Sequence, residues 1–204
     1  MKLTTYTGGI CATNGFLLET PDGNLLVDAP EGISAWAAAR GVRIDHLLLT
    51  HQHFDHVLDA AALQAAGTCL HAMEDYSDEF TLESVSRKWG MPVPVVPYRI
   101  DQRLLPDPTR PMSLCGLQFT LYHVPGHAVD SVVFYLPEFE LAFSGDTLFA
   151  GSIGRTDLPG GSHQLLLDGI ARHLLTLPPL TRLLPGHGPA TTVAEEAAHN
   201  PYLQ

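Results

Sequence analysis

The sequence predicts an α/β layered fold in a single domain. Three observations lead to this prediction. Apolar runs of strand length recur in both halves of the chain, segments with helical spacing lie between and after them, and glycine-containing turns separate the two. A length of 204 residues is ordinary for one domain. We therefore expect one domain that spans residues 1–204.

The first half of the chain begins with strands and continues as an alternation of strands and helices. Residues 21–24 read Pro-Asp-Gly-Asn, a turn signal, so the strands on either side should form a hairpin. Gly41 and Gly67 each follow a helical stretch and stop it. We expect strands at residues 3–7, 10–20, 25–28, 46–50 and 68–72, and helices at residues 33–40 and 57–66.

The second half repeats this theme after a less regular middle. Residues 74–89 suit a helix, whereas the prolines of residues 91–111 exclude a long regular element, so we expect a surface excursion there. Beyond it we expect strands at residues 117–123, 132–136, 141–144 and 182–184, a loop at residues 145–161, and a helix at residues 163–175.

The composition excludes several classes of function. The chain has 22 acidic and 11 basic residues, a net charge of -11, and no basic run that could bind nucleic acid or an anionic membrane. The first residues contain no apolar stretch long enough for a signal peptide, so we expect none, and no segment approaches the roughly 20 apolar residues that span a bilayer. Cys11, Cys69 and Cys115 are odd in number and form no CxxC pair, so we interpret them as small buried apolar residues of a cytoplasmic protein.

Ligand-type side chains are densest between residues 51 and 56. This segment reads His-Gln-His-Phe-Asp-His and follows a predicted strand. Residues two apart in an extended segment point to the same side, so His51 and His53 can converge on one metal ion. Asp55 and His56 follow before the next predicted helix and can turn toward a second ion. Three histidines and an aspartate in six positions favour a metal site over a set of surface histidines.

Three further candidates each follow an apolar run on a glycine-flanked turn. They are His127 in Pro-Gly-His, Asp146 in Ser-Gly-Asp, and His187 in Pro-Gly-His-Gly. Each signal is weak alone, but together they form a pattern of strand ends that present one ligand each. His123 could support His127 from outside the ligand set. We interpret the remaining histidines as structural or surface residues: His46, His71, His163, His173 and His199.

The order HxHxDH, PGH, GD and PGHG resembles the metallo-β-lactamase-fold hydrolases over almost the whole chain. Residues 145–149 (Gly-Asp-Thr-Leu-Phe) and 154–157 (Gly-Arg-Thr-Asp) resemble the glyoxalase II branch. The closing residues 200–203 (Asn-Pro-Tyr-Leu) are similar to the ends of short bacterial glyoxalase II-like, hydroxyacylglutathione hydrolase-like proteins. The resemblance implies a four-layer αβ/βα sandwich, without the C-terminal helical substrate-binding domain of larger glyoxalase II enzymes.

The resemblance also implies a binuclear metal centre. Donors without thiolate suit zinc above all, with iron or manganese as alternatives. Asp55 and Asp146, the two carboxylates, are the expected catalytic residues. The implied ligands are His51, His53 and His127 for the first ion, Asp55, His56 and His187 for the second, and Asp146 as the bridge between them.

The implied reaction is hydrolysis of a thioester such as S-D-lactoylglutathione. Two divalent ions lower the pKa of a shared water toward about 7, and the resulting hydroxide attacks the carbonyl carbon. The leaving thiolate needs little protonation. The centre is net positive, which favours a small anionic substrate. Arg155 is a candidate substrate-binding residue, and an arginine paired with a carboxylate is the alternative interpretation.

Two other functions remain open at this point. A persulfide dioxygenase shares the fold and much of the Gly-Arg-Thr-Asp loop, and it would hold one iron through His51, His127 and Asp146. A non-catalytic metal-binding module is the third possibility. The number and identity of the bound ions, together with oxygen uptake, separate these functions.

Overall fold

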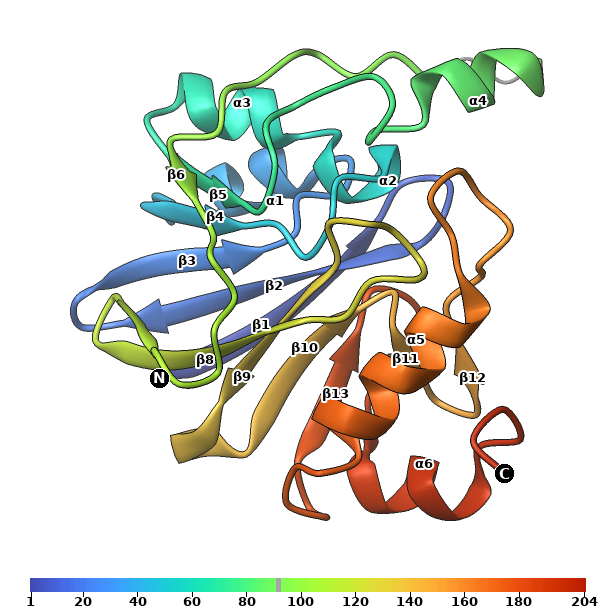
Figure 1. Cartoon of the computed structure of the whole chain (residues 1–204). Helices are drawn as coiled ribbons and strands as arrows, with labels where there is room; N and C mark the ends of the chain where they lie inside the picture. Colours follow the sequence, from blue (N-terminus) through green and yellow to red (C-terminus); the bar gives the residue numbers. More distant parts are fainter. Residues whose placement is uncertain (91–92) are drawn as a thin grey trace. The chain divides into compact units, whose positions relative to one another are not determined.

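Two six-stranded sheets organise the chain, and Figure 1 labels most of their strands. The computed structural model describes residues 1–90 and 93–204. The first sheet belongs to a compact unit of residues Met1–Leu104 and the second to a compact unit of residues Leu105–Gln204. Each unit has a hydrophobic core formed by its own residues.

The sheet of the first unit follows chain order from β1 to β6. Its first three strands are antiparallel neighbours, and each strand from β3 onward runs parallel to the next. The elements of this unit are β1 (Lys2–Gly8), β2 (Thr13–Thr20), β3 (Gly23–Val27), α1 (Ile33–Ala39), β4 (His46–Leu48), α2 (Phe54–Val57), α3 (Ala60–Ala65), β5 (Cys69–Ala72), α4 (Glu83–Lys88) and β6 (Gln102–Arg103).

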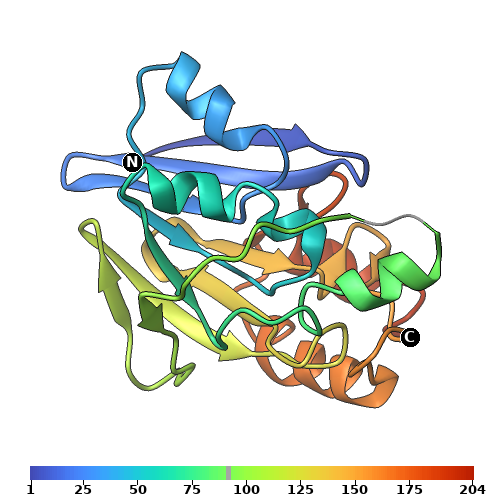
Figure 2. The same cartoon turned by 90° about the horizontal axis from the view of Figure 1, so that it is seen from above.

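Helices α1 and α3 cover one face of this sheet, and Figure 2 shows α3, in teal, lying over the strands. Leu47 of β4 and Leu70 of β5 point to that face and share a core with Ile33 of α1 and Leu63 of α3. Burial of each such side chain contributes roughly 1.5–3 kcal/mol. The helices therefore stabilise the central strands, whose carboxyl ends carry the predicted ligand segment.

The sheet of the second unit has the order β14-β13-β10-β9-β8-β7. Only β10 and β13 pair in parallel among its described strands; the other neighbours are antiparallel. The elements are β7 (Met112–Leu114), β8 (Leu117–His123), β9 (Val132–Leu136), η1 (Pro137–Phe139), β10 (Leu141–Gly145), β11 (Leu148–Phe149), β12 (Ser152–Ile153), α5 (His163–Gly169), η2 (Ile170–Leu174), β13 (Arg182–Pro185), β14 (Thr191–Thr192) and α6 (Val193–His199).

Strand directions in the second unit bring three chain turns to one edge of the sheet. Strand β8 is antiparallel to β9 and β9 is antiparallel to β10, so β8 runs in the same direction as β10 and its parallel neighbour β13. The carboxyl ends of all three strands therefore meet at the same edge, where open α/β sheets place ligands. Leu166 of α5 and Val193 of α6 pack on the strands of this unit in its core.

The α/β class, the hairpin β2–β3 and most expected strands are confirmed. The expected strand at residues 10–20 begins at Thr13, because residues 9–12 form a turn in which Ala12 has a φ of 52°. The expected helix at residues 57–66 is confirmed only in part, since α3 covers Ala60–Ala65 and Val57 is the last residue of α2. The Ala29 amide donates to the His56 carbonyl at 2.7 Å and the Asp59 amide donates to the Ala29 carbonyl at 3.0 Å, so the chain between the two helices is bonded to residue 29.

The middle of the chain departs further from expectation. The helix expected at residues 74–89 shrinks to α4, because Leu82 has a left-handed φ of 59° that an α-helix does not accept. The surface excursion expected at residues 91–111 is confirmed for most of its described residues, which are exposed or partly exposed and form only the short strand β6. It is wrong at Val95, Tyr98 and Ile100, which are buried in the core of the first unit. Residues 91 and 92, including Pro92, lie outside the described residues.

Several smaller elements were not expected. The hairpin β11–β12 lies within the expected loop at residues 145–161, and the sequence analysis did not predict α6. The cysteine prediction is also wrong, since Cys11 is exposed and Cys69 and Cys115 are partly exposed. Among the residues that the structure describes, no helix combines the length and apolar character that a membrane crossing requires.

Candidate metal centre

The four candidate ligands of the first unit lie beyond the carboxyl end of β4. Strand β4 ends at Leu48 and α2 begins at Phe54, so His51 and His53 lie on the connection while Asp55 and His56 lie within α2. The ring of His51 is 4.6 Å from that of His53 and 4.2 Å from that of His56, measured between centroids. The three imidazoles are buried. The expectation that this segment gathers its side chains is therefore met within the first unit.

Gln52 lies between His51 and His53, and its side chain fixes the β4–α2 connection through hydrogen bonds to two other segments. Its side-chain amide donates to the Glu74 carbonyl at 3.0 Å, and its side-chain carbonyl accepts a hydrogen bond from the Tyr98 hydroxyl at 2.9 Å. Gln52 is fully buried. These two hydrogen bonds fix the backbone from which His51 and His53 project.

Asp28 organises the ligand segment although the sequence analysis did not select it. It follows β3 directly, and its carboxylate accepts hydrogen bonds from the Thr50 amide and the Thr50 hydroxyl, both at 2.8 Å, and from Nδ1 of His56 at 2.9 Å. The Thr50 hydroxyl donates to Asp28, so at 3.1 Å it accepts from Nδ1 of His51. Both histidines then present an unprotonated Nε2, the form that binds a metal ion.

The carboxylate of Asp55 is also held in place. The hydroxyl of Thr13, the first residue of β2, donates to Oδ2 of Asp55 at 2.6 Å. The same oxygen lies 3.4 Å from Nε2 of His56. An ionised carboxylate has two oxygens and about four lone-pair sites, so Asp55 can accept from Thr13 and also bind a metal ion.

The three candidate ligands of the second unit follow β8, β10 and β13. The carboxylate oxygen Oδ2 of Asp146 is 3.4 Å from Nε2 of His127 and 3.3 Å from Nε2 of His187. Nδ1 of His127 donates to the main-chain carbonyl of Arg155 at 2.9 Å, so its Nε2 is also the unprotonated nitrogen. The structure thus gathers these three residues at one edge of the second sheet, as the sequence predicted.

Gly154 lies in close contact with the turns that carry Asp146 and His127. A Cβ on Gly154 would lie 1.9 Å from the carbonyl oxygen of Asp146 and 3.1 Å from Cβ of His127. The Gly154 amide donates to the Thr147 carbonyl at 3.1 Å. Only a residue without a side chain fits between the turn that carries Asp146 and the one that carries His127.

The spacing of the donor atoms supports metal binding. Two ligand atoms about 2.1 Å from one ion in tetrahedral geometry lie about 3.4 Å apart. The three imidazole–carboxylate distances between candidate ligands of the same unit, at 3.3 or 3.4 Å, match that spacing and exceed the about 2.7–2.9 Å of a charge-assisted hydrogen bond. Imidazole nitrogen and carboxylate oxygen suit zinc, iron or manganese. The residues therefore fit divalent ions.

Arg155 pairs with a carboxylate two residues away. Its Nε and one terminal nitrogen contact the two oxygens of Asp157 at 2.7 and 2.8 Å, and both side chains are exposed. The Arg155 guanidinium lowers the pKa of Asp157 to about 2, so this carboxylate is ionised at neutral pH. The substrate contact expected of Arg155 stays a prediction, and it would be made by an arginine already bound to Asp157.

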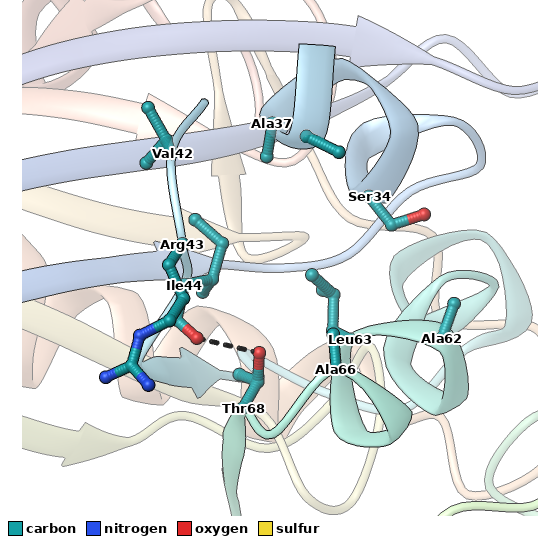
Figure 3. Close-up of a pocket in the computed structure, with 10 residues that line it drawn as sticks. Ser34, Ala37, Val42, Arg43, Ile44, Ala62, Leu63, Ala66 and Thr68 are labelled. Atoms are coloured by element: carbon teal, nitrogen blue, oxygen red, sulfur yellow. Dashed lines mark hydrogen bonds between the residues drawn. The ribbon is translucent and has the colours of Figure 1, made fainter. Parts of the chain in front are cut away.

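Two other features lie outside these ligand sets. His123 donates through Nε2 to the Val129 carbonyl at 2.8 Å, in the loop that carries His127. Nδ1 of His127 is hydrogen-bonded to the Arg155 carbonyl and not to His123. A hollow of about 100 Å³ lies between α1 and α3. Figure 3 shows its lining residues and the hydrogen bond from the Thr68 hydroxyl to the Ile44 carbonyl, which is 2.9 Å long. Alanine, valine and leucine side chains line much of it, and none of the predicted ligands does.

The fold and its donor sets define a metal-binding α/β protein. Residues 8–187 match the Metallo-beta-lactamase superfamily, and the chain belongs to that superfamily. The probable metallo-hydrolase YqgX of Bacillus subtilis is 32% identical over all of this chain and 98% of YqgX. The hydroxyacylglutathione hydrolase GloC of Haemophilus influenzae is 35% identical over 77% of this chain and 74% of GloC. The protein is a metal-dependent hydrolase of this superfamily.

Solved structures confirm the metallo-β-lactamase fold. The BLEG-1 B3 metallo-beta-lactamase is similar over 100% of both chains, with a TM-score of 0.87 and 32% identity. TTHA1623, solved in a di-iron-bound form, is similar over 98% of this chain and 100% of its own, with a TM-score of 0.84 and 38% identity. The α/β fold class with mixed sheets is therefore established, whereas the assignment of all seven residues to one centre stays a prediction.

Proposed function

We propose that the protein hydrolyses a thioester of an anionic thiol, such as S-D-lactoylglutathione. The observation that carries this proposal is the similarity to GloC, which is a hydroxyacylglutathione hydrolase and is 35% identical over 77% of this chain. The resemblance of residues 145–149 and 154–157 to the glyoxalase II branch supports the same substrate class. The superfamily and the similarity to YqgX support hydrolysis, and the proposal specifies the bond that is cleaved.

The ligand sets of the two units together hold two divalent ions under this proposal. The nitrogen and oxygen donors support zinc as the expected metal, and the di-iron form of TTHA1623 supports iron as an alternative. When bound, the ions would supply Lewis acidity and a water whose pKa is lowered toward about 7. The proposed ligands are His51, His53, Asp55, His56, His127, Asp146 and His187.

The contribution of the chain is to place these donors before the substrate arrives. Asp28 holds His56, Thr50 holds His51, and the Arg155 carbonyl holds His127, so little reorganisation is needed on binding. The guanidinium of Arg155 is exposed on the segment whose carbonyl orients His127. It would contact a carboxylate of the anionic thiol.

The identity of the leaving group decides which side chains the reaction needs. A thiolate is a stable anion near neutral pH and departs without a strong general acid. The carboxylates of Asp55 and Asp146 are close to imidazoles, and both are assigned to the metals. Thioester hydrolysis, which requires no strong proton donor, therefore suits these residues better than hydrolysis of an ester or amide, whose alkoxide or amine leaving group must be protonated.

The experiment is a substrate panel on protein loaded in turn with Zn²⁺, Mn²⁺ and Fe²⁺. Thiol release from S-D-lactoylglutathione is compared with cleavage of a lactone, an oxygen ester with the same acyl group and a β-lactam. We expect the largest kcat/KM for the thioester. Protein with two ions per chain that leaves the thioester intact, or that prefers the β-lactam, contradicts the proposal.

Variants show whether the assigned residues carry the reaction. Asp146→Asn should lower kcat/KM by more than about 100-fold, beyond the loss seen when only a partner of a ligand is removed. The control is His199→Gln, because His199 is exposed on α6, contacts Glu195 at 3.1 Å and is not an assigned ligand. The control should retain wild-type activity and metal content.

Metal counting tests the remaining alternative, a persulfide dioxygenase with one iron held by His51, His127 and Asp146. That function predicts one ferrous ion per chain and oxygen uptake with glutathione persulfide. Our proposal predicts two ions per active chain and thiol release without oxygen uptake. Elemental analysis and an oxygen electrode, applied to the same preparation, give opposite results for the two functions.

A further inference from the structure

A second group of metal-ligand side chains lies within the first unit, away from residues 51–56. His46 begins β4, and Cys69 and His71 belong to β5, which pairs with β4 in parallel. His46 is the register partner of Cys69, and His71 is two residues further along. Because side chains alternate along a strand, all three point to the sheet face opposite that of Leu47 and Leu70, which pack against the helices.

The potential ligand atoms of these three residues are close together. Nδ1 of His46 lies 3.0 Å from Nε2 of His71, and one ligand atom from each of the three residues lies within 4.8 Å of the others. In a tetrahedral site, a nitrogen at about 2.0–2.1 Å from zinc and a sulfur at about 2.3 Å lie about 3.6 Å apart. A movement of up to about 1.2 Å by the Cys69 side chain therefore closes the group around one ion.

The surroundings favour a neutral imidazole and an accessible thiol. Burial, with a further contribution from His46, lowers the pKa of His71 to about 4, so its ring is uncharged at neutral pH. Burial also raises the pKa of the Cys69 thiol, and nearby Asp101 raises it further. A bound cation would replace the thiol proton, as it does when cysteine becomes a metal ligand. His46 and Cys69 are only partly buried, which leaves a route for an ion to enter.

We propose that His46, Cys69 and His71 form a separate binding site for one thiophilic divalent cation of the zinc class. The two imidazole nitrogens and the thiolate supply three ligands, and water completes a four-coordinate site. The carboxylate of Asp101, near both Cys69 and His71, adds favourable negative charge. The site lies entirely within the first unit and does not depend on the proposed thioester hydrolysis.

The thiolate distinguishes this site from the candidate centre, whose seven ligands are nitrogen and oxygen atoms. Cobalt(II) bound by a thiolate gives an intense sulfur-to-metal charge-transfer band in the near ultraviolet, and cobalt bound by imidazole and carboxylate alone does not. The probe is therefore Co²⁺, titrated into reduced full-length protein from which metal has been removed with a chelator. We expect a charge-transfer band that saturates with one thiolate-bound Co²⁺ per chain, in addition to the Co²⁺ that the seven-ligand centre binds.

Matched cysteine variants assign the band. Cys69→Ser should abolish it and lower the total Co²⁺ content by one ion per chain. Cys115→Ser is the control, since Cys115 is also partly exposed but lies in the second unit, and it should leave the band unchanged. His46→Gln should weaken binding at this site while leaving hydrolase activity intact. Absence of the band, its survival in Cys69→Ser or its loss in Cys115→Ser would overturn the proposal.

A measurement on the wild-type protein makes the test independent of variant folding. Alkylation of each cysteine is followed by peptide mass spectrometry with and without Zn²⁺. At a free Zn²⁺ concentration ten times the dissociation constant, alkylation of Cys69 should slow about tenfold, because only the unbound fraction reacts. Alkylation of Cys11 and Cys115 should not change. Equal rates at Cys69 with and without Zn²⁺ contradict the site.

Discussion

The two units of the chain orient their candidate ligands by different means. In the first unit, four ligand-type residues lie within six positions, and the carboxylate of Asp28 orients His56 directly and His51 through Thr50. In the second unit, the three ligand-type residues follow three separate strands, and the main-chain carbonyl of Arg155 orients His127. A side-chain partner can be deleted by substitution, whereas a carbonyl can only be moved. The two halves should therefore respond differently to mutation.

The largest effect should come from Asp28. Asp28→Ala removes the acceptor of three buried hydrogen bonds and should lower the free energy of unfolding by about 3–5 kcal/mol. Asp28→Asn keeps the shape and tolerates the φ of 61°, yet it should weaken metal binding about 10–100-fold. Denaturant unfolding and metal competition measure the two effects. The control, Asp22→Ala in the exposed β2–β3 turn, should change stability by less than about 0.5 kcal/mol.

Acid should destabilise the metal-free first unit through His71. The pKa of His71 is about 4 in the folded chain, below its ordinary value of 6.5, so the unfolded chain binds a proton first. Stability is then complete above about pH 6.5 and falls as the pH drops toward 4, by on the order of 2–3 kcal/mol. In His71→Gln the slope of stability against pH should flatten in this window. In His163→Gln, at an exposed histidine of the second unit, it should not. Equal slopes in wild type and His71→Gln would contradict this assignment.

In the second unit, a substitution at Gly154 can displace the neighbouring Arg155 carbonyl, which orients His127. Gly154→Ala places a Cβ 1.9 Å from the Asp146 carbonyl oxygen, so the turns that carry Asp146 and His127 must separate. We expect a loss of about 1–3 kcal/mol in unfolding free energy and at least a tenfold loss of kcat, roughly 1.4 kcal/mol in barrier height. Gly151→Ala is the matched control, because its Cβ meets no atom within 4 Å and its cost comes only from a φ of 69°. It should lose stability but keep kcat.

The smallest effect should come from the side chain of Arg155. Arg155→Ala removes the guanidinium and keeps the carbonyl that orients His127. Metal content should therefore be unchanged, and stability should change by less than about 1 kcal/mol because the Asp157 pair is exposed. If the guanidinium binds the anionic thiol, KM for S-D-lactoylglutathione should rise about tenfold, equivalent to about 1.4 kcal/mol. A neutral thioester should show no change, and an equal rise for both substrates would argue against a charge contact.

The candidate ligands could be selected from the sequence because each segment that carries them follows a strand, and their role as ligands stays a prediction. An apolar run followed by a glycine turn and a polar residue is visible without tertiary information, as at His127 and His187. Asp28 also ends an apolar run, but its partners, Thr50 and His56, are more than 20 residues away in the chain. Its role depends on the parallel pairing of β3 with β4, which no local pattern encodes.

Boundaries and burial were less predictable for the same reason. The expected helix at residues 57–66 is confirmed only in part, and the chain before α3 is hydrogen-bonded to Ala29, from another part of the chain. The proline-rich stretch suggested a surface segment, yet Val95, Tyr98 and Ile100 complete the core of the first unit. Local propensity identifies what a segment cannot form, whereas its burial depends on distant partners. The cluster of His46, Cys69 and His71 was missed because β4 and β5 must pair before it exists.

The order of strands in the first sheet has a consequence for synthesis of the chain. Strands β1 to β6 are neighbours in the sheet in the order in which they are translated, and their pairings join residues at most 31 positions apart, from His71 to Gln102. N-terminal portions of a chain fold first during translation. The first sheet can thus begin to form while residues 105–204 are still being made. The segment from His51 to His56 leaves the ribosome ahead of His127, Asp146 and His187.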